Sequence, residues 1–238
     1  MTRLNDPERV RQEYATEDGL RARASIYEAV SGPDARELAF QAVREAAPRH
    51  VLEVGCGWGE FAERLRVELR VDVVAVDLSP RMVELARERG VDARQGDVQD
   101  LPFEDASFDV VVANWMLYHV ADLERGLSEL ARVLRPGGRL VAATNSLDHL
   151  SELWRLVGRD RHWEQERFFS ENAEGPLRQH FALVQRRDVT GSVTFADRDA
   201  ARGYIASSVA HKHLADLVPE LSEPLVATRH NSTFIAEK

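Results

Sequence analysis

A short apolar run that ends in a cluster of glycines constrains the fold of this chain more than any other feature. Residues 51–54 form the apolar run, three glycines follow within residues 55–59, and large apolar side chains then recur every four positions across residues 61–69. An apolar run closed by glycines predicts a strand and a tight turn, and the four-residue spacing predicts a helix. A strand, a turn and a helix in this order form the repeating unit of α/β proteins.

The same unit repeats along most of the chain. Further strands are expected at residues 73–77, 91–95, 108–113, 139–144, 181–189 and 233–236. Near-continuous apolar strands that alternate with helices are typical of a parallel sheet covered on both faces. We therefore predict an α/β protein with a Rossmann-like, doubly wound and mostly parallel sheet of seven strands.

Four consecutive parts are predicted within the 238 residues. They are an N-terminal helical cover at 1–47, a ligand-binding core at 48–146, a helical insertion over the carboxyl edge of the sheet at 147–180, and strands and a helix that complete the same sheet at 181–238. Within the cover, helices are expected at residues 7–15, 19–30 and 33–47.

Composition and charge narrow the function classes. With 44% hydrophobic and 30% charged residues, the chain has the composition of a globular protein. A net charge of −9 and a pI near 5.4 disfavour nucleic-acid partners, because that affinity depends on clustered Lys and Arg. No segment approaches the ~20 apolar residues that cross a bilayer, and the N-terminus lacks a signal-peptide pattern, so we expect no membrane span and a cytoplasmic location.

The glycine turn by itself leaves several ligands open. Glycines after the first strand let the backbone approach a ligand closely. The dinucleotide fingerprint needs a glycine three positions after Gly57, where this chain has Glu60, and the phosphate-binding pattern that ends in Gly-Lys-Ser/Thr is missing. Asp77 ends the second strand and suits two ribose hydroxyls, because a carboxylate offers two acceptor oxygens. Enzymes that use NAD share this carboxylate, so Asp77 alone does not distinguish NAD from other ligands that contain a ribose.

Five segments together are more specific. They are residues 51–59, 76–82, 96–103, 108–111 and 134–138. In sequence, order and spacing they resemble the motifs of the class I S-adenosylmethionine-dependent methyltransferases, particularly the small-molecule group that includes the ubiquinone and menaquinone C-methyltransferases. The resemblance covers roughly residues 51–144 and implies S-adenosylmethionine as the cofactor.

The resemblance implies a role for each matching position. The implied cofactor-binding residues are Tyr14, Glu53, Gly55, Cys56, Gly57, Gly59, Asp77, Leu78, Met82, Asp97, Val98, Asn114 and Trp115. Gly55 and Gly57 would approach the methionine part of the cofactor, with Glu53 supporting the turn. Asp77 would hold the ribose hydroxyls.

Other positions would serve the adenine and the sulfonium. Leu78 and Met82 would pack on the adenine, and Asp97 and the Val98 N–H would bind its edge. Asn114 would meet the methionine end through its backbone, with Trp115 beside it, and Tyr14 would cover the sulfonium. Plain core packing stays open for Leu78, Met82, Trp115 and Tyr14, and a small residue in a tight turn stays open for Cys56.

The sequence defines the residues around the acceptor less clearly than those around the cofactor. His119, in the loop after the fourth strand, could take a proton from the acceptor, because imidazole titrates near neutral pH. A structural or substrate-lining role for His119 is also open. Tyr118, Asn145 and Trp154 are expected on the substrate side, and the insertion with Trp154, Trp163, Phe168 and Phe169 is expected to supply most of the acceptor pocket.

The predicted function is transfer of a methyl group from S-adenosylmethionine to a small-molecule acceptor by in-line displacement, without a metal. His211 and His213 lie two residues apart and have no third ligand, so no metal site is expected there. The Asn/Asp-Pro-Pro-Tyr signature is absent after the fourth strand, which lowers the case for nucleic-acid nitrogens. Alternatives are RNA or protein methylation, or a non-catalytic S-adenosylmethionine-binding protein. A monomer or homodimer is expected.

Overall fold

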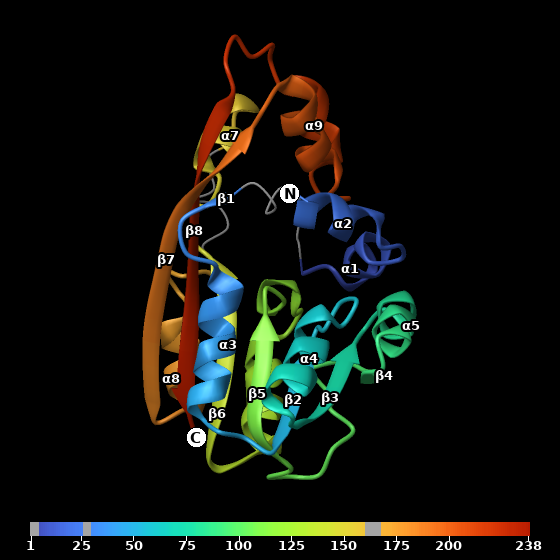
Figure 1. The fold of residues 1–238 in the computed structure, drawn as a ribbon, viewed down its shortest axis with the longest axis vertical. Helices are drawn as coiled ribbons and strands as arrows, with labels where there is room; N and C mark the ends of the chain where they lie inside the picture. Colours follow the sequence, from blue (N-terminus) through green and yellow to red (C-terminus); the bar gives the residue numbers. More distant parts are fainter. Residues whose placement is uncertain (1–4, 26–29, 160–167) are drawn as a thin grey trace.

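A single sheet of eight strands organises the molecule (Figure 1). The structure, a computed structural model, describes residues 5–25, 30–159 and 168–238. The strands are β1 (Val30–Ser31), β2 (His50–Val54), β3 (Asp72–Asp77), β4 (Asp92–Gln95), β5 (Phe108–Asn114), β6 (Leu134–Asn145), β7 (Leu183–Phe195) and β8 (Leu225–Glu237). Their order across the sheet is β1-β7-β8-β6-β5-β2-β3-β4.

Most strands run in parallel. β2 pairs in parallel with β3 and β5, β3 with β4, and β5 with β6. β8 lies between β6 and β7 and is antiparallel to both. The predicted α/β class with a mostly parallel sheet is confirmed, and the seven expected strands are all present.

The eighth strand is the two-residue β1, which pairs antiparallel with β7. A helix was expected to extend to Val30, and this expectation is wrong, because Val30 belongs to β1. The chain passes very close to β7 there: a Cβ on Gly32, which has a φ of 92°, would lie 2.8 Å from the Thr190 carbonyl oxygen. Only a glycine fits this crossing without displacing the neighbouring strand.

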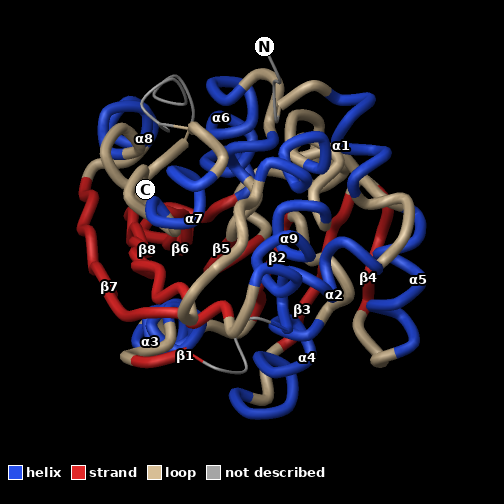
Figure 2. The backbone as a smooth tube through the Cα atoms, turned by 90° about the horizontal axis from the view of Figure 1, so that it is seen from above, coloured by secondary structure: helices blue, strands red, loops and turns tan. Residues whose placement is uncertain are grey.

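Helices cover both faces of the sheet (Figure 2). They are α1 (Pro7–Glu13), α2 (Asp18–Ser25), α3 (Ala35–Glu45), α4 (Glu60–Arg64), α5 (Pro80–Glu88), α6 (Leu123–Val133), α7 (Ser151–Leu156), α8 (Glu174–His180) and α9 (Arg198–Ala206). A π-helical turn, η2 (Leu65–Leu69), extends α4, and η3 (Leu117–His119) and η5 (Lys212–Leu217) are 3₁₀ turns.

The side chains of β5 point alternately to the two faces of the sheet and show which helices cover each face. Val110 and Val112 pack with α3, α4 and α5 in one apolar cluster, whereas Val111 and Ala113 pack with α6 and α8 in the other. Successive side chains of a strand point to opposite faces, so a strand that is apolar throughout must be covered on both sides.

The two described helices of the segment 147–180 lie in different places: α7 lies beyond the carboxyl ends of the parallel strands, and α8 lies beside the sheet (Figure 1). Helix α8 packs beside α6 on one face of the sheet. Helix α7 packs with α9 and the ends of β7 and β8 in a third apolar cluster. The apolar residues of the two helices are therefore buried in two separate cores, and the placement expected for the segment is wrong for α8. Among the described helices, none is long and apolar enough to cross a membrane.

Candidate active site

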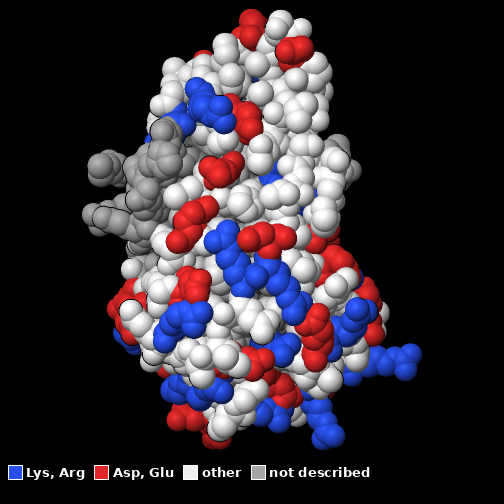
Figure 3. Space-filling view, turned by 90° about the vertical axis from the view of Figure 1, so that its left-hand side faces the viewer, with Lys and Arg blue, Asp and Glu red and all other residues white. Residues whose placement is uncertain are grey.

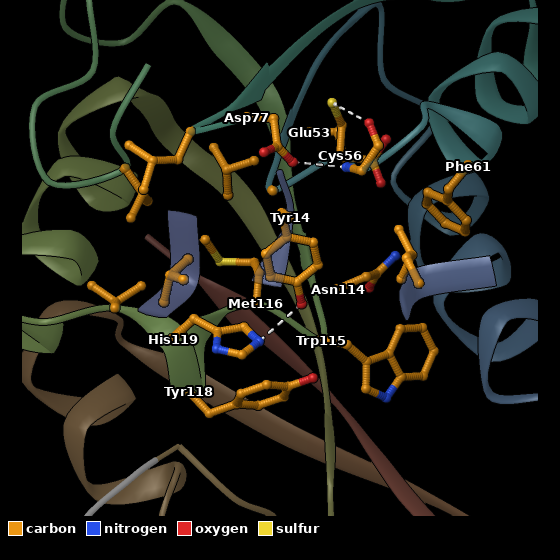
Figure 4. A pocket seen from close by; sticks show the side chains of 18 of the residues that line it. Tyr14, Glu53, Cys56, Phe61, Asp77, Asn114, Trp115, Met116, Tyr118 and His119 are labelled. Carbon is orange, nitrogen blue, oxygen red and sulfur yellow. Dashed lines mark hydrogen bonds between the residues drawn. The ribbon is translucent and has the colours of Figure 1, made fainter. Parts of the chain in front are cut away.

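One cavity of about 390 Å³ is lined by residues at the carboxyl ends of the parallel strands and by residues of α1 and α2 (Figure 4). Figure 1 shows these two helices above the strand ends. The walls of the cavity come from the turn after β2, the ends of β3, β5 and β6, the loop after β4, the 3₁₀ turn η3, and the N-terminal helices. In open α/β sheets ligands bind in this position, because the carboxyl ends of the strands and the adjoining turns leave a crevice there.

The glycine turn after β2 forms the floor of the cavity. Gly55 has a φ of 65°, and a Cβ added to it would lie 2.7 Å from the Met116 Cβ. Gly57 has a φ of 54°, and its N–H donates to Asp77 Oδ2 at 2.9 Å. Positive φ values are penalised in residues with a Cβ. The two glycines therefore bring the backbone against the end of β3 and leave the space above the turn open.

Asp77 sits at the end of β3 and faces the cavity. Its two oxygens accept from the N–H groups of Gly57 and Ser79, each at 2.9 Å. Desolvation raises the pKa of the Asp77 carboxyl to about 6, although the backbone donors oppose this rise. At neutral pH the group is mostly ionised, and each oxygen retains a lone pair for a further donor.

Glu53 lies next to this carboxylate and behaves differently. It is 3% exposed, and burial raises its pKa to about 8, helped by the negative charge of Asp77 and opposed by the Ala62 N–H. Its Oε2 has no hydrogen-bond partner within the described part of the chain. Glu53 is therefore protonated at neutral pH. Burial also raises the pKa of the Cys56 thiol, which stays neutral.

Tyr14 closes the cavity from the N-terminal side. Its hydroxyl and His119 Nε2 lie 3.0 Å apart, and the two rings meet edge to face (Figure 4). Its backbone carbonyl accepts from Ser79 Oγ at 2.7 Å. Ser79 also caps α5 by accepting from the Met82 N–H. Tyr14 thus ties the loop after α1 to both the β3 end and η3.

Most of the residues expected at the site line this cavity. They are Tyr14, Glu53, Gly55, Cys56, Gly57, Asp77, Leu78, Asp97, Val98, Asn114, Trp115, Tyr118, His119 and Asn145. Both carboxylate oxygens of Asp97 accept from Gln99 in this structure. Trp115 has a φ of 52° and donates from its indole N–H to Asn145 Oδ1 at 3.1 Å. The roles assigned to these residues stay predictions.

Three expected site residues lie outside the cavity lining. A Cβ on Gly59, whose φ is 79°, would lie 2.7 Å from the Ala86 Cβ, so this glycine allows the turn to pack against α5. Met82 is fully buried on the inner face of α5. Trp154 packs on His211, with ring centroids 4.8 Å apart, in the third apolar cluster. The Met82 and Trp154 side chains thus face a core, Gly59 packs against α5, and none of the three lines the cavity.

The other aromatic residues of the insertion do not line the cavity either. Phe168 and Phe169 are both 1% exposed and lie in the protein core. Trp163 lies outside the described residues. None of the described residues between 147 and 180 lines the cavity, so the expectation that this segment supplies most of the acceptor pocket is wrong for them.

The cavity is also lined by residues that were not assigned to the site from the sequence. They include Leu20 and Arg23 of α2, Arg36 of α3, Trp58, Phe61, Met116, Tyr204 of α9, and Arg229 and Asn231 of β8. Arg229 and Asn231 stand two residues apart on one strand and therefore point to the same face. No period-two pattern marks them, because residues 228–232 are all polar. β8 was expected to begin at residue 233, and it begins at Leu225.

Comparison with known proteins identifies the family. The sequence pattern described as a methyltransferase domain matches residues 52–142. The chain is 36% identical over 176 residues to an uncharacterized methyltransferase of Mycobacterium tuberculosis, and the match covers 69% of each protein. It is 41% identical over 102 residues to the demethylmenaquinone methyltransferase of Deinococcus radiodurans, which covers 40% of this chain and 42% of that protein.

A solved structure agrees with these matches. The S-adenosylmethionine-dependent methyltransferase of Thermotoga maritima superposes with a TM-score of 0.55 at 25% identity, and the match covers 86% of this chain and 89% of that one. The family and the cofactor that the five motifs imply are confirmed. With its glycine turn, its Asp77 carboxylate and these relatives, the chain belongs to the S-adenosylmethionine-dependent methyltransferases.

Proposed function

We propose that this methyltransferase methylates a small organic acceptor that enters the cavity beside the methyl donor. The observation that carries the proposal is that one cavity extends from the donor motifs to a second, differently built wall. One end holds the glycine turn and Asp77, and the other is walled by residues of η3, β6 and β8. The name of the Deinococcus relative, a demethylmenaquinone methyltransferase, supports a small organic acceptor.

The residues at the first end fit S-adenosylmethionine. Asp77 offers lone pairs on an ionised carboxylate, which suits the two ribose hydroxyls. The side-chain amide of Asn114 lines the cavity, and both its Nδ2 and Oδ1 are buried without a partner among the residues described. An unpaired buried amide is costly. A ligand with its own polar groups near Asn114 would satisfy it.

The sulfonium of the cofactor supplies an activated methyl carbon and a good leaving group. The protein then has to hold the acceptor atom in line with that carbon, which can provide much of the rate enhancement. Tyr14 covers this space and its hydroxyl fixes the His119 ring. We assign His119 a lining and positioning role in which its ring forms part of the acceptor wall, and no step is assigned to a metal.

Methylation of RNA has less support. On the face that carries β7, Lys and Arg side chains alternate with Asp and Glu side chains and form no continuous basic patch (Figure 3). Binding to a phosphate backbone relies on such a patch. The net charge of −9 agrees with this.

Calorimetry with S-adenosylmethionine and S-adenosylhomocysteine provides the first test. We expect both compounds to bind in the micromolar range. If neither compound binds at millimolar concentration, the proposal is wrong. The second test incubates the protein with S-adenosylmethionine and a panel of small acids, phenols, amines and quinols, and detects a mass increase of one methyl group. Donor binding without turnover of any acceptor would instead support a non-catalytic binding protein.

A further inference from the structure

A buried arginine lines the end of the cavity that is far from the donor motifs. Arg229 of β8 is 2% exposed and forms part of the cavity wall. Its Nη2 donates to the backbone carbonyls of Pro33 and Ser31. Its Nε is buried without a hydrogen-bond partner in the described ranges. No carboxylate of the described residues forms an ion pair with it, so its charge lacks a counter-ion there.

The other arginines of the cavity wall differ in this respect. Arg11 pairs with Glu8 at 3.6 Å, Arg23 pairs closely with Glu13, and Arg36 pairs with Asp34 at 3.3 Å. Each of these positive charges therefore has a carboxylate partner. Burying a guanidinium without an anion is unfavourable, because two neutral carbonyls do not replace its hydration. An anionic ligand in the cavity would supply the missing partner.

The neighbours of Arg229 form a polar wall. Asn231 is 3% exposed and donates from Nδ2 to Asn145 Oδ1 at 2.7 Å. The Trp115 indole N–H donates to the same oxygen at 3.1 Å. This arrangement fixes the Asn145 amide and leaves its Nδ2 without a hydrogen-bond partner among the residues that the structure describes. Asn145 and Asn231 thus add polar groups beside the charge.

This wall is separated from the donor-binding turn. In the sheet, β5 and β6 lie between β2 and β8. Neighbouring strands are about 4.8 Å apart, so β8 lies roughly 14 Å from the strand that carries the glycine turn. A ligand bound to Asp77 and the turn therefore leaves the Arg229 end of the cavity for the second substrate.

We propose that Arg229 binds a carboxylate of the acceptor, so that the second substrate is a small organic acid. The inference rests on the proposed function and names its substrate class. A single uncompensated guanidinium matches a single negative charge. A carboxylate carries one charge and fits the planar guanidinium, whereas a phosphate monoester carries about −1.5 to −2 at pH 7. Arg229 is thus a specificity residue, with Asn145 and Asn231 beside it.

The test compares matched acids and amides. Benzoate, cinnamate and hexanoate are each measured by calorimetry beside the corresponding primary amide, with phenyl phosphate as a further arm, in protein saturated with S-adenosylhomocysteine. We expect at least one acid to bind ten-fold or more tightly than its amide and more tightly than phenyl phosphate. Equal affinity for acids and amides, no binding of any acid at millimolar concentration, or tighter binding of phenyl phosphate would overturn the proposal.

Three variants test whether Arg229 causes the preference for acids over amides. Arg229→Met should abolish the difference between acid and amide. Asn231→Asp places a carboxylate two residues from Arg229 on the same face, and it should also lower acid affinity at least ten-fold while the arginine is kept. Arg187→Met is the charge-matched control, because Arg187 pairs with Glu45 outside the cavity lining, and it should keep the preference. Retention of the preference in Arg229→Met would contradict the assignment.

The affinity for S-adenosylhomocysteine separates this inference from the proposed function. We expect Arg229→Met and Asn231→Asp to keep that affinity within about three-fold, which also shows that they fold. Loss of S-adenosylhomocysteine binding in Arg229→Met to the same degree as loss of acid binding would place Arg229 on the donor and overturn the inference. Failure of the unmodified protein to bind S-adenosylhomocysteine would instead count against the proposed function. The affinities for acids and amides can still be compared in protein that holds no S-adenosylhomocysteine.

Discussion

The two ends of the cavity are built in different ways. At the donor end, neighbouring segments satisfy each other: Asp77 accepts from the backbone of the adjacent turn and from its own following turn. At the acceptor end, the contacts join residues far apart in the chain, such as Tyr14 with His119 and Asn145 with Asn231. Polar atoms are left without partners at both ends, as at Asn114 of the donor end and Arg229 of the acceptor end, among the residues that the structure describes. The carboxylate of the donor end is thus held by the backbone of two strand-end turns, whereas the acceptor end is assembled from side chains of distant segments.

This difference predicts that substitutions at one end leave the other end largely intact. The donor end depends on backbone geometry and on carboxylates, so single changes there should have large effects on donor affinity or on stability. The acceptor end depends on separate side chains, so single changes there should alter selectivity with smaller effects on the donor.

The largest effect is expected from Asp77→Ala. Two hydrogen bonds from ribose hydroxyls to a charged group are each worth about 1.5–3 kcal/mol, so the affinity for S-adenosylhomocysteine should fall at least about a hundred-fold. Calorimetry measures the change. An affinity that stays within three-fold of the unmodified protein refutes the assignment of Asp77 to the ribose.

The pKa of Asp77, about 6, supplies a control for this prediction. As the pH falls through 6 the carboxyl becomes protonated and loses acceptor capacity, so donor affinity should decline. Asp77→Asn cannot titrate and should show little of this decline. Parallel pH dependence in both proteins would mean that another group controls donor binding.

Gly59→Ala should mainly affect stability. A positive φ costs an alanine roughly 1–2 kcal/mol, and the contact with Ala86 at 2.7 Å adds to this cost, for a total of roughly 2–4 kcal/mol in the free energy of unfolding. Gly137→Ala is the matched control, because Gly137 has a φ of 73° but nothing within 4 Å of its added Cβ. Denaturant unfolding should show a clearly larger loss for Gly59→Ala. Equal losses of unfolding free energy in the two variants would show that the packing of Gly59 against Ala86 does not contribute to stability.

Glu53→Gln should change how stability depends on pH. Burial raises the pKa of Glu53 from 4.5 to about 8, so the folded protein keeps a proton that the unfolded chain releases. The contribution to stability is therefore full below about pH 4.5 and is lost as the pH rises through 8. Between about pH 6.5 and 8 this loss amounts to about 2 kcal/mol. Denaturant unfolding of Glu53→Gln should lack this slope, and identical slopes would show that Glu53 is ionised in the folded protein.

The smallest effect is expected from His119→Gln. Glutamine keeps a polar group near the Tyr14 hydroxyl, and a residue that only lines the acceptor site contributes modestly to the rate. With an identified acceptor, kcat should therefore fall less than about ten-fold. Loss of a general base typically costs about 10²–10⁴-fold. A drop of that size, together with loss of the acidic limb of the pH profile, would assign His119 the base role.

The fold and the donor end could be predicted from sequence because their information is local. An apolar run such as residues 108–113 must be covered on both faces, and the glycine turn and Asp77 each come at the end of such an apolar strand. Motif membership did not show which way a side chain points, which is why Met82 was assigned to the ligand although it faces the core.

The acceptor end depends on tertiary contacts that local patterns do not contain. β8 was expected to begin at residue 233, after the uninterrupted polar run 228–232, yet it begins at Leu225 and pairs along its length with β7. Within this strand Arg229 and Asn231 point to the same face, which borders the cavity. Trp154 was assigned to the acceptor as an aromatic residue of the insertion, but its helix packs against α9 and η5.

A crystal structure with S-adenosylhomocysteine tests the division of the cavity most directly. We predict that the ribose hydroxyls lie within about 3 Å of the Asp77 carboxylate, that the sulfur faces the wall formed by Asn145 and Asn231, and that Arg229 makes no contact with the ligand. Electron density that places the amino-acid carboxylate of S-adenosylhomocysteine on Arg229 would contradict the account, because the donor would then occupy the end assigned to the acceptor.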